Sequence, residues 1–165
     1  MSLSLANFNA LVDSHGPALY RVAYRLVGDR HEAEDLVQET FRSAWKSREG
    51  FQAGRGERAW LVAILRRRSV DRWRRTGPAP VLLGDSSREA GVTDTDPIAN
   101  QYTDEMQHAL AQLPDELRET LLLVVVGELT HQEVADLLIV PLGTILSRVS
   151  RSRRRLRDLL TCAKS

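Results

Sequence analysis

Residues 128–157 constrain the fold more than any other part of this 165-residue chain, because they carry the signals of two short helices joined by a turn. Thr130 and Glu133 have the T-x-x-E spacing of a capping box, in which the threonine oxygen accepts a bond from an N–H of the first turn and the glutamate returns to the cap N–H. Pro141 then redirects the chain and opens a second helix. The segment therefore predicts a helix-turn-helix with helices beginning at Thr130 and near Pro141.

The second of these helices is amphipathic. Its apolar seam consists of Ile145, Val149, Leu156 and Leu159. Its polar face carries Thr144, Ser147, Arg148 and Arg151 at i, i+3, i+4 and i+7. Hydroxyl and guanidinium groups near a helix N-terminus can read base edges in the major groove, and the trailing Arg154 and Arg155 can neutralise phosphates. A solvated amphipathic helix is the plainer alternative, but the cap, the proline and the basic face together favour DNA binding.

The first half of the chain also has apolar residues at helical spacing. Gly16-Pro17 predicts either a helix pair or one kinked helix, which ends at Gly28. Asp29 and Glu32 then predict a helix from residue 30 to about residue 46. One face of that helix carries Asp35, Gln38, Glu39 and Arg42 at i, i+3, i+4 and i+7. A polar patch of this kind is more often a solvated surface than a site.

A basic helix is predicted from Glu57 to Arg75, after a loop that contains Gly50, Gly54 and Gly56. Between residues 61 and 75, six arginines stand against one aspartate, so this segment has the charge of a polyanion-binding surface. All tryptophans of the chain lie from Trp45 to Trp73. Aromatic faces beside a basic track hold single-stranded bases, although Trp45 and Trp60 are expected in the core.

The charge is distributed unevenly along a chain whose formal net charge is only +1. Residues 146–160 are as basic as residues 61–75, whereas residues 29–39 and 84–105 are acidic, which disfavours a single uniform nucleic-acid face. Residues 76–100 contain three prolines and three glycines without an apolar period, and so predict a linker. The expected division is a domain over residues 1–76, an acidic flexible linker over residues 77–97, and a domain over residues 98–165.

An all-α fold of two small helical domains is expected. The only ambiguous stretch is the apolar run Leu121 to Val126, whose β-branched half suits a buried strand. No second segment could pair with such a strand, so the run is interpreted as a buried helix.

Composition also bears on location and chemistry. The single cysteine, Cys162, leaves no disulfide framework or cysteine metal site, and a reducing cytoplasm fits. We expect a cytoplasmic protein without membrane insertion, because neither a signal sequence nor a run of about 20 apolar residues is present. An enzyme built on the acids near His31 is disfavoured, since those acids follow capping and surface spacing. Neither a catalytic residue nor a metal or cofactor is expected.

With both halves considered, the chain resembles a group IV (extracytoplasmic-function, ECF) sigma factor of bacterial RNA polymerase from about residue 8 to residue 160. In the first half, the motifs AEDLVQETF and WLVAILRRRSVDRWRR are similar to sigma region 2. In the second half, LPDELRETLLL, ELTHQEVADLL and PLGTILSRVSRSRRRLR are similar to region 4. The resemblance implies a transcription initiation factor that binds core RNA polymerase, recognises the −10 and −35 promoter elements, assists strand opening and is held inactive by an anti-sigma protein.

The resemblance also implies roles for individual residues. The residues that match the polymerase-docking region 2.2 are Asp35, Gln38, Glu39 and Arg42. Those that match the region contacting duplex and melted −10 DNA are Arg66, Arg67, Asp71, Arg72, Arg74 and Arg75. Those that match the −35-reading region 4.2 are Thr144, Ser147, Arg148, Arg151, Arg154 and Arg155. Rival interpretations are a helix-turn-helix regulator that binds duplex DNA without polymerase, and an inactive or sequestered sigma relative.

Four positions depart from the family pattern. Arg67 replaces a usual asparagine, Glu128 stands where glycine is usual, Ile139 replaces the turn glycine, and Leu146 replaces a usual basic residue. If the turn needs a positive φ, a β-branched residue there costs roughly 1–2 kcal/mol. Leu146 either turns inward beside Ile145 and thickens the apolar seam, or stays exposed and forms an apolar patch with Val124. We favour the exposed patch, which an anti-sigma protein would cover.

Overall fold

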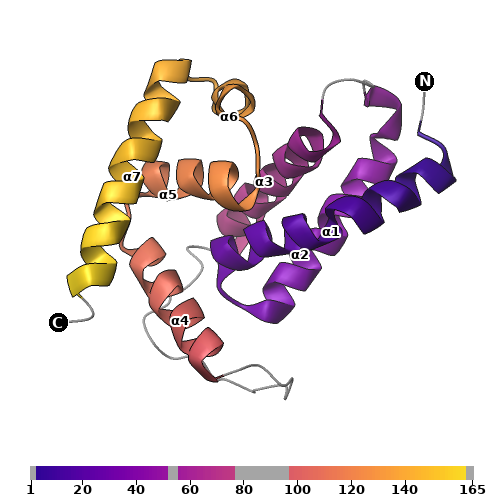
Figure 1. Ribbon diagram of the computed structural model, residues 1–165. Coiled ribbons are helices and arrows are strands. Elements are labelled where there is room, and N and C mark those ends of the chain that lie inside the picture. The colour runs from indigo at the N-terminus through magenta and orange to yellow at the C-terminus, as the bar shows by residue number, and fades with distance from the viewer. Residues whose placement is uncertain (1–2, 52–55, 77–96, 163–165) are drawn as a thin grey trace.

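The computed structural model describes residues 3–51, 56–76 and 97–162. Throughout these ranges the ordered elements are helices, with no strand among them (Figure 1). The first half contains α1 (Leu5–Val27), α2 (Arg30–Lys46), the 3-10 turn η1 (Arg48–Gly50) and α3 (Glu57–Thr76). The second half contains α4 (Pro97–Ala111), α5 (Asp115–Leu121), the π-helical segment η2 (Leu122–Val126), α6 (His131–Leu138) and α7 (Leu142–Cys162). The all-α fold class is thereby confirmed.

The first two helices are bounded by the residues that the sequence indicated. α1 runs without interruption through Pro17, so the first segment is one helix and not a helix pair. Gly28 ends it in the left-handed conformation, with φ at 74°, and its N–H bonds the Tyr24 carbonyl. The Asp29 carboxylate then accepts from the N–H of Glu32 at 2.9 Å and caps α2.

The predicted helix-turn-helix is formed by α6 and α7. Both bonds of the capping box are present: the N–H of Glu133 donates to the Thr130 hydroxyl at 3.1 Å, and the N–H of Thr130 donates to the Glu133 carboxylate at 3.0 Å. Ile139 ends α6 in the left-handed region, with φ at 57°. Of the apolar seam on α7, Ile145 and Val149 are buried, and Leu156 and Leu159 are half-buried.

The apolar run at residues 121–126 is helical, as interpreted from the sequence. It belongs to the end of α5 and to η2, where the N–H of Gly127 bonds the Leu122 carbonyl five residues back, at 2.9 Å. The run is not uniformly buried. Leu122 and Leu123 are enclosed, whereas Val125 is 51% exposed, because η2 is a surface helix that turns one side to solvent.

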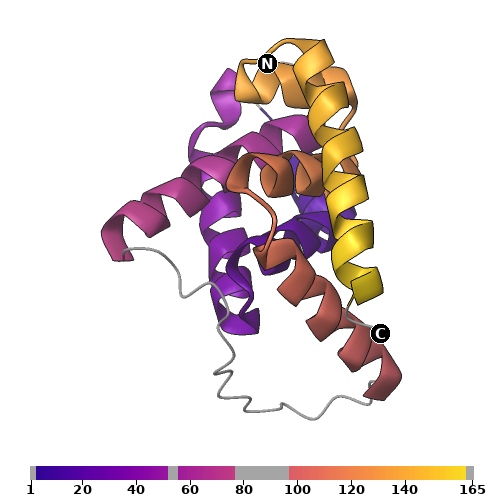
Figure 2. The same ribbon diagram turned by 90° about the vertical axis from the view of Figure 1, so that its left-hand side faces the viewer.

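The two halves of the chain pack directly on each other in this structure. Figure 1 shows α5 lying between α7 and the bundle of α1–α3, and Figure 2 shows α3 and α7 on different sides of α5. A single cluster of buried side chains joins Val22 of α1 and Val62 of α3 to Leu123, Val134 and Ile145 of the second half. The predicted linker lies almost entirely outside the described residues, and the domain boundaries at residues 76 and 98 stay predictions.

Candidate nucleic-acid interface

The predicted polar face of α2 lies on the outer side of that helix. The opposite side is fixed by buried residues, namely Ala33, Leu36, Thr40 and Ala44. Asp35, Gln38 and Arg42 are exposed, and Glu39 is half-buried. The structure therefore brings the four predicted residues together on one accessible face, as their helical spacing requires.

Arg72 of α3 reaches across to this acidic face. Its guanidinium donates to the Glu32 carboxylate at 3.0 Å and to the Glu32 carbonyl at 3.1 Å. It also lies 3.9 Å from the carboxylate of Asp35 and 3.8 Å from that of Glu39. Arg72 thus connects the predicted polymerase-docking face with the predicted DNA-contacting helix. Neither helix alone indicates this pairing, because its partners lie on two different helices.

The other predicted DNA-contacting residues of α3 fall into two sets. Arg67, Arg74 and Arg75 are exposed, and Trp73, next to Arg74, is 55% exposed. These four side chains combine positive charge with an accessible aromatic face. Arg66 and Asp71 are half-buried.

The other two tryptophans are structural, as expected from the sequence. Trp45 packs against Phe8, with ring centroids 5.0 Å apart, and Trp60 packs against Phe51 at 4.9 Å. Both are half-buried against the main cluster of buried residues. Elsewhere on the first half, burial raises the pKa of the Tyr20 phenol above its ordinary value.

The exposed polar face of α7 is centred on Ser147, Arg151 and Arg154, which are spaced i, i+4 and i+7 and are all exposed. Arg155 is exposed as well, and Thr144 is half-buried. Arg148 is placed differently: its side chain is only 16% exposed, and its guanidinium lies 3.6 Å from the Glu116 carboxylate of α5. The helical pattern of α7 alone could not reveal this partner on another helix.

Exposed apolar residues surround the start of α7. Leu146 is 50% exposed, Leu142 one turn before it is 40% exposed, and Ile139 in the preceding turn is 90% exposed. Val124, the expected companion of Leu146, is half-buried against the core. The exposed apolar neighbour of Leu146 on its own helix is Leu142, a pair at i and i+4 that lies off the buried seam and could have been found from that spacing.

Polar contacts join the two halves around α3 and α1. Arg66 of α3 forms an ion pair with Glu119 of α5, and Arg58, near the start of α3, forms one with Glu128. On α1, the Arg25 guanidinium donates to the Gln107 side-chain oxygen at 3.1 Å, and the Gln107 amide donates to the Arg25 carbonyl at 3.0 Å.

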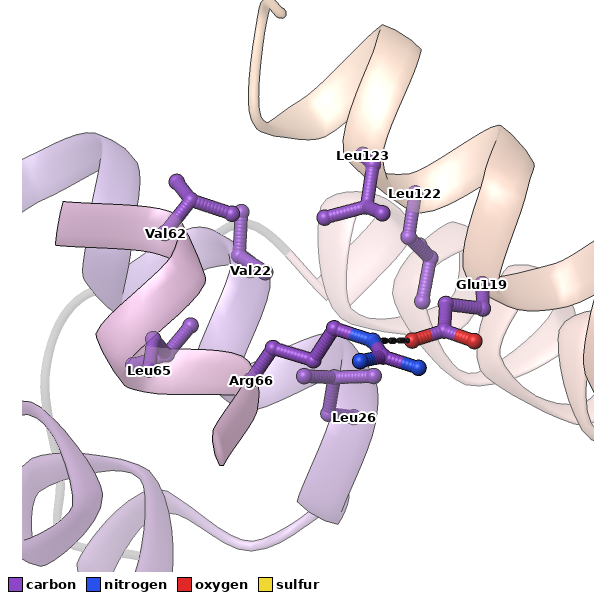
Figure 3. A pocket seen from close by; sticks show the side chains of 8 residues that line it. All are labelled: Val22, Leu26, Val62, Leu65, Arg66, Glu119, Leu122 and Leu123. Atoms are coloured by element: carbon purple, nitrogen blue, oxygen red, sulfur yellow. Dashed lines mark hydrogen bonds and ion pairs between the residues drawn. The ribbon is translucent and has the colours of Figure 1, made fainter. Parts of the chain in front are cut away.

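A small apolar cavity lies at the junction of the halves (Figure 3). Its lining consists of Val22, Leu26, Val62, Leu65, Arg66, Glu119, Leu122 and Leu123. In Figure 3 the Arg66–Glu119 pair spans this junction from α3 to α5. The lining is otherwise aliphatic and offers no set of polar groups that could orient a cofactor.

Among residues 3–51, 56–76 and 97–162, no three His, Cys, Asp or Glu side chains are grouped to hold a metal ion. In the same ranges no helix combines the length and the apolar character that crossing a membrane requires.

Comparison with known proteins gives a consistent result for both halves. Residues 11–78 match the family described as Sigma-70 region 2, and residues 103–156 match the one described as Sigma-70, region 4. The chain is 38% identical to the ECF RNA polymerase sigma factor SigE of Mycolicibacterium smegmatis, over 95% of this chain and 63% of that protein, so it spans less than two thirds of SigE. It is 33% identical to the ECF RNA polymerase sigma factor SigL of Mycobacterium tuberculosis, over 92% of this chain and 88% of SigL.

A solved structure matches across both halves as well. The sigma factor RpoE of Bartonella quintana, in a co-crystal with the anti-sigma factor NepR, superposes with a TM-score of 0.75 at 30% identity. The match covers 95% of this chain and 98% of RpoE, so one superposition accounts for both halves together.

Proposed function

This chain belongs to the sigma-70 family, in its ECF group, and from that membership we infer that it binds core RNA polymerase and directs it to specific promoters. The observation that carries the inference is that one chain presents two basic helices, α3 and α7, each with exposed arginines and each in a different half. A protein that must hold two separated promoter elements needs two such surfaces, since phosphate contacts position a protein on DNA while base contacts select the sequence.

Polymerase docking belongs to the exposed face of α2. Asp35, Gln38, Glu39 and Arg42 correspond to the family's polymerase-docking region. The face is accessible and mostly acidic, which suits a basic surface on the polymerase, because complementary charge accelerates association and fixes register.

Contact with the −10 element belongs to α3. Arg67, Arg74 and Arg75 are placed to neutralise phosphates, and Trp73 offers a stacking face for an unpaired base, worth about 1–3 kcal/mol per stacked base. An enzyme role forms no part of the proposal, because strand opening here needs binding free energy and no chemical step.

Reading of the −35 element belongs to α7. Ser147 and Arg151 lie on its exposed face and can reach base edges, while Arg154 and Arg155 can contact phosphates. Arg148 can contact the −35 element only when its guanidinium leaves the Glu116 carboxylate and binds DNA. Because polymerase works in the cytoplasm, the protein is placed there, and an anti-sigma protein is its expected regulator, by analogy with RpoE bound to NepR.

Co-elution with core polymerase tests this function against its main rival. The purified chain is mixed with core RNA polymerase and resolved by gel filtration, and its binding to promoter duplexes is measured in parallel without polymerase. We expect a stable complex with the core enzyme. Stable duplex binding by the isolated chain, without any co-elution, would favour a regulator that acts independently of polymerase.

A further inference from the structure

We propose that this chain inhibits itself: Glu119 and Glu128 of the second half occupy Arg66 and Arg58 of α3, so that the second half and promoter DNA compete for the same helix. The proposal rests on the proposed function, since it assigns α3 to nucleic acid. It goes further in making the closed arrangement of the halves a property of this chain, independent of any anti-sigma protein.

The first support is where the ion pairs lie. Among the described residues, two ion pairs that join the halves both use α3, the basic helix of the first half: Arg66 binds Glu119 and Arg58 binds Glu128. Guanidinium groups bind carboxylates and phosphates through the same kind of charged hydrogen bond, so in the proposal each carboxylate competes with a DNA phosphate for its arginine. A helix that is closed in this way has two fewer arginines available to DNA.

The second support is the backbone of Glu128. Its φ is 56°, a left-handed conformation that glycine adopts without strain and that side chains disfavour. ECF sigma factors usually have glycine at this position. Here the neighbouring Gly127 has a negative φ, so the left-handed strain falls on Glu128. A strained backbone conformation persists when surrounding contacts stabilise it. At Glu128 the stabilising contact is the ion pair with Arg58.

The third support is the close approach of α6 to the start of α3. Gly56 has a φ of 61°, and a Cβ built on it would lie 2.8 Å from the Glu133 carboxylate. That glutamate belongs to the capping box of α6. The start of the helix-turn-helix therefore lies next to Gly56, immediately before α3, although Gly56 itself stays exposed.

The fourth support is the apolar seam beneath the ion pairs. In Figure 3, Leu122 and Leu123 face Val22 and Val62 across the junction, and the Arg66–Glu119 pair lies at its edge. Burial of this apolar seam favours packing of the two halves, and this contribution does not depend on the charged residues. The ion pairs are partly exposed, so they are sensitive to salt and to competing polyanions. RpoE in its complex with the anti-sigma factor NepR superposes over both halves, so a similar arrangement of the halves occurs in a sigma factor bound to an anti-sigma factor.

The test measures closure and DNA binding in the same full-length protein. Donor and acceptor dyes are placed on the native Cys162 of α7 and on Ser14→Cys of α1, both exposed positions. Energy transfer then reports the separation of the halves, and a fluorescein-labelled single-stranded oligonucleotide of mixed sequence reports the availability of α3. The closed protein should lose energy transfer as NaCl rises from about 0.05 M to about 0.5 M, because salt screens partly exposed pairs.

The central variant is Glu119→Gln with Glu128→Gln. We expect lower energy transfer, a weaker response of energy transfer to salt, and oligonucleotide binding about five- to tenfold tighter, since two ion pairs no longer compete. Glu34→Gln with Glu49→Gln removes the same charge from exposed sites away from the junction. This control should leave energy transfer unchanged and bind the oligonucleotide less than about twofold tighter. Equal affinity gains in both variants, or unchanged energy transfer in the first, would overturn the proposal.

Glu128→Gly separates opening from misfolding. Glycine removes the carboxylate and also relieves the positive φ, so this variant should open the halves while keeping its helical circular dichroism. A closed Glu128→Gly protein would contradict the proposal. If the opened variants are confirmed but no variant directs transcription with core polymerase, the proposed function fails and the self-closure stands.

Discussion

Ile139 combines two features that a folded domain normally avoids in one residue. Its backbone is left-handed, and its β-branched side chain is 90% exposed. The turn between α6 and α7 thus requires a positive φ, as the sequence comparison with a usual glycine anticipated. The Ile139 side chain is kept although its backbone is strained. It lies in solvent near the exposed Leu142 and Leu146, where a partner protein can contact it.

Replacing Ile139 with glycine should stabilise the protein. We expect Ile139→Gly to raise the free energy of unfolding by about 0.5–1 kcal/mol, because relief of the left-handed strain exceeds the added flexibility of the unfolded chain. Urea denaturation measures the change. Ile139→Ala is the matched control, since alanine keeps the Cβ that causes the strain. If glycine and alanine give the same stability, the strain is absent.

Base reading by α7 should depend on Arg151 more than on Arg148. Arg151 is exposed, whereas Arg148 is largely covered and lies against Glu116. In polymerase holoenzyme, Arg151→Ala should relax the choice at one base pair by about 1–3 kcal/mol. Arg148→Ala should relax it less. Binding to a panel of single-base variants of the −35 duplex measures both, and a larger loss of selectivity for Arg148→Ala would reverse the assignment.

Leu146 tests whether the apolar patch is a partner surface. Because half of its side chain is exposed, Leu146→Lys should leave the melting temperature unchanged while it strengthens binding to −35 DNA and weakens a sequestering anti-sigma protein. Thermal melting and duplex titrations measure these effects. A loss of stability of about 2 kcal/mol would instead identify Leu146 as a core residue.

At the scale of elements, local signals in the sequence were sufficient to predict where helices begin and end. The capping residues Asp29 and Thr130, and the stop at Gly28, begin and end helices where predicted, because their bonds involve only neighbours in the chain. Pro17 left two possibilities open, since its effect on α1 depends on packing that the sequence does not specify. The same reason explains Arg72 and Arg148, whose carboxylate partners lie on other helices.

The acidic face of α2 gives the prediction at this scale. Asp35→Lys with Glu39→Lys should abolish co-elution with core polymerase, because it reverses the charge that would meet a basic surface. Circular dichroism should show a folded protein, since Asp35 is exposed and Glu39 is half-buried. Glu34→Lys with Glu49→Lys is the control of equal charge change. Unchanged co-elution of the α2 variant would remove the docking role from this face.

At the scale of the whole molecule, the sequence indicated two halves but not their contact. Leu122 and Leu123 were expected to be buried, and they are, yet part of their packing is against α1 and α3 of the other half. Glu119 and Glu128 have no feature in the sequence that marks them as partners of Arg66 and Arg58. Contacts between segments far apart in the chain depend on the complete arrangement of helices, which periodicity and capping do not encode.

The central claim is that this chain confers promoter choice on RNA polymerase. Core polymerase with the purified chain is incubated on a pool of genomic promoter fragments, and the 5′ ends of the transcripts are sequenced. The account predicts discrete start sites that share −10 and −35 sequences, which are absent with core polymerase alone and with the Asp35→Lys, Glu39→Lys variant. Transcripts that start at the same positions with and without the chain would contradict it.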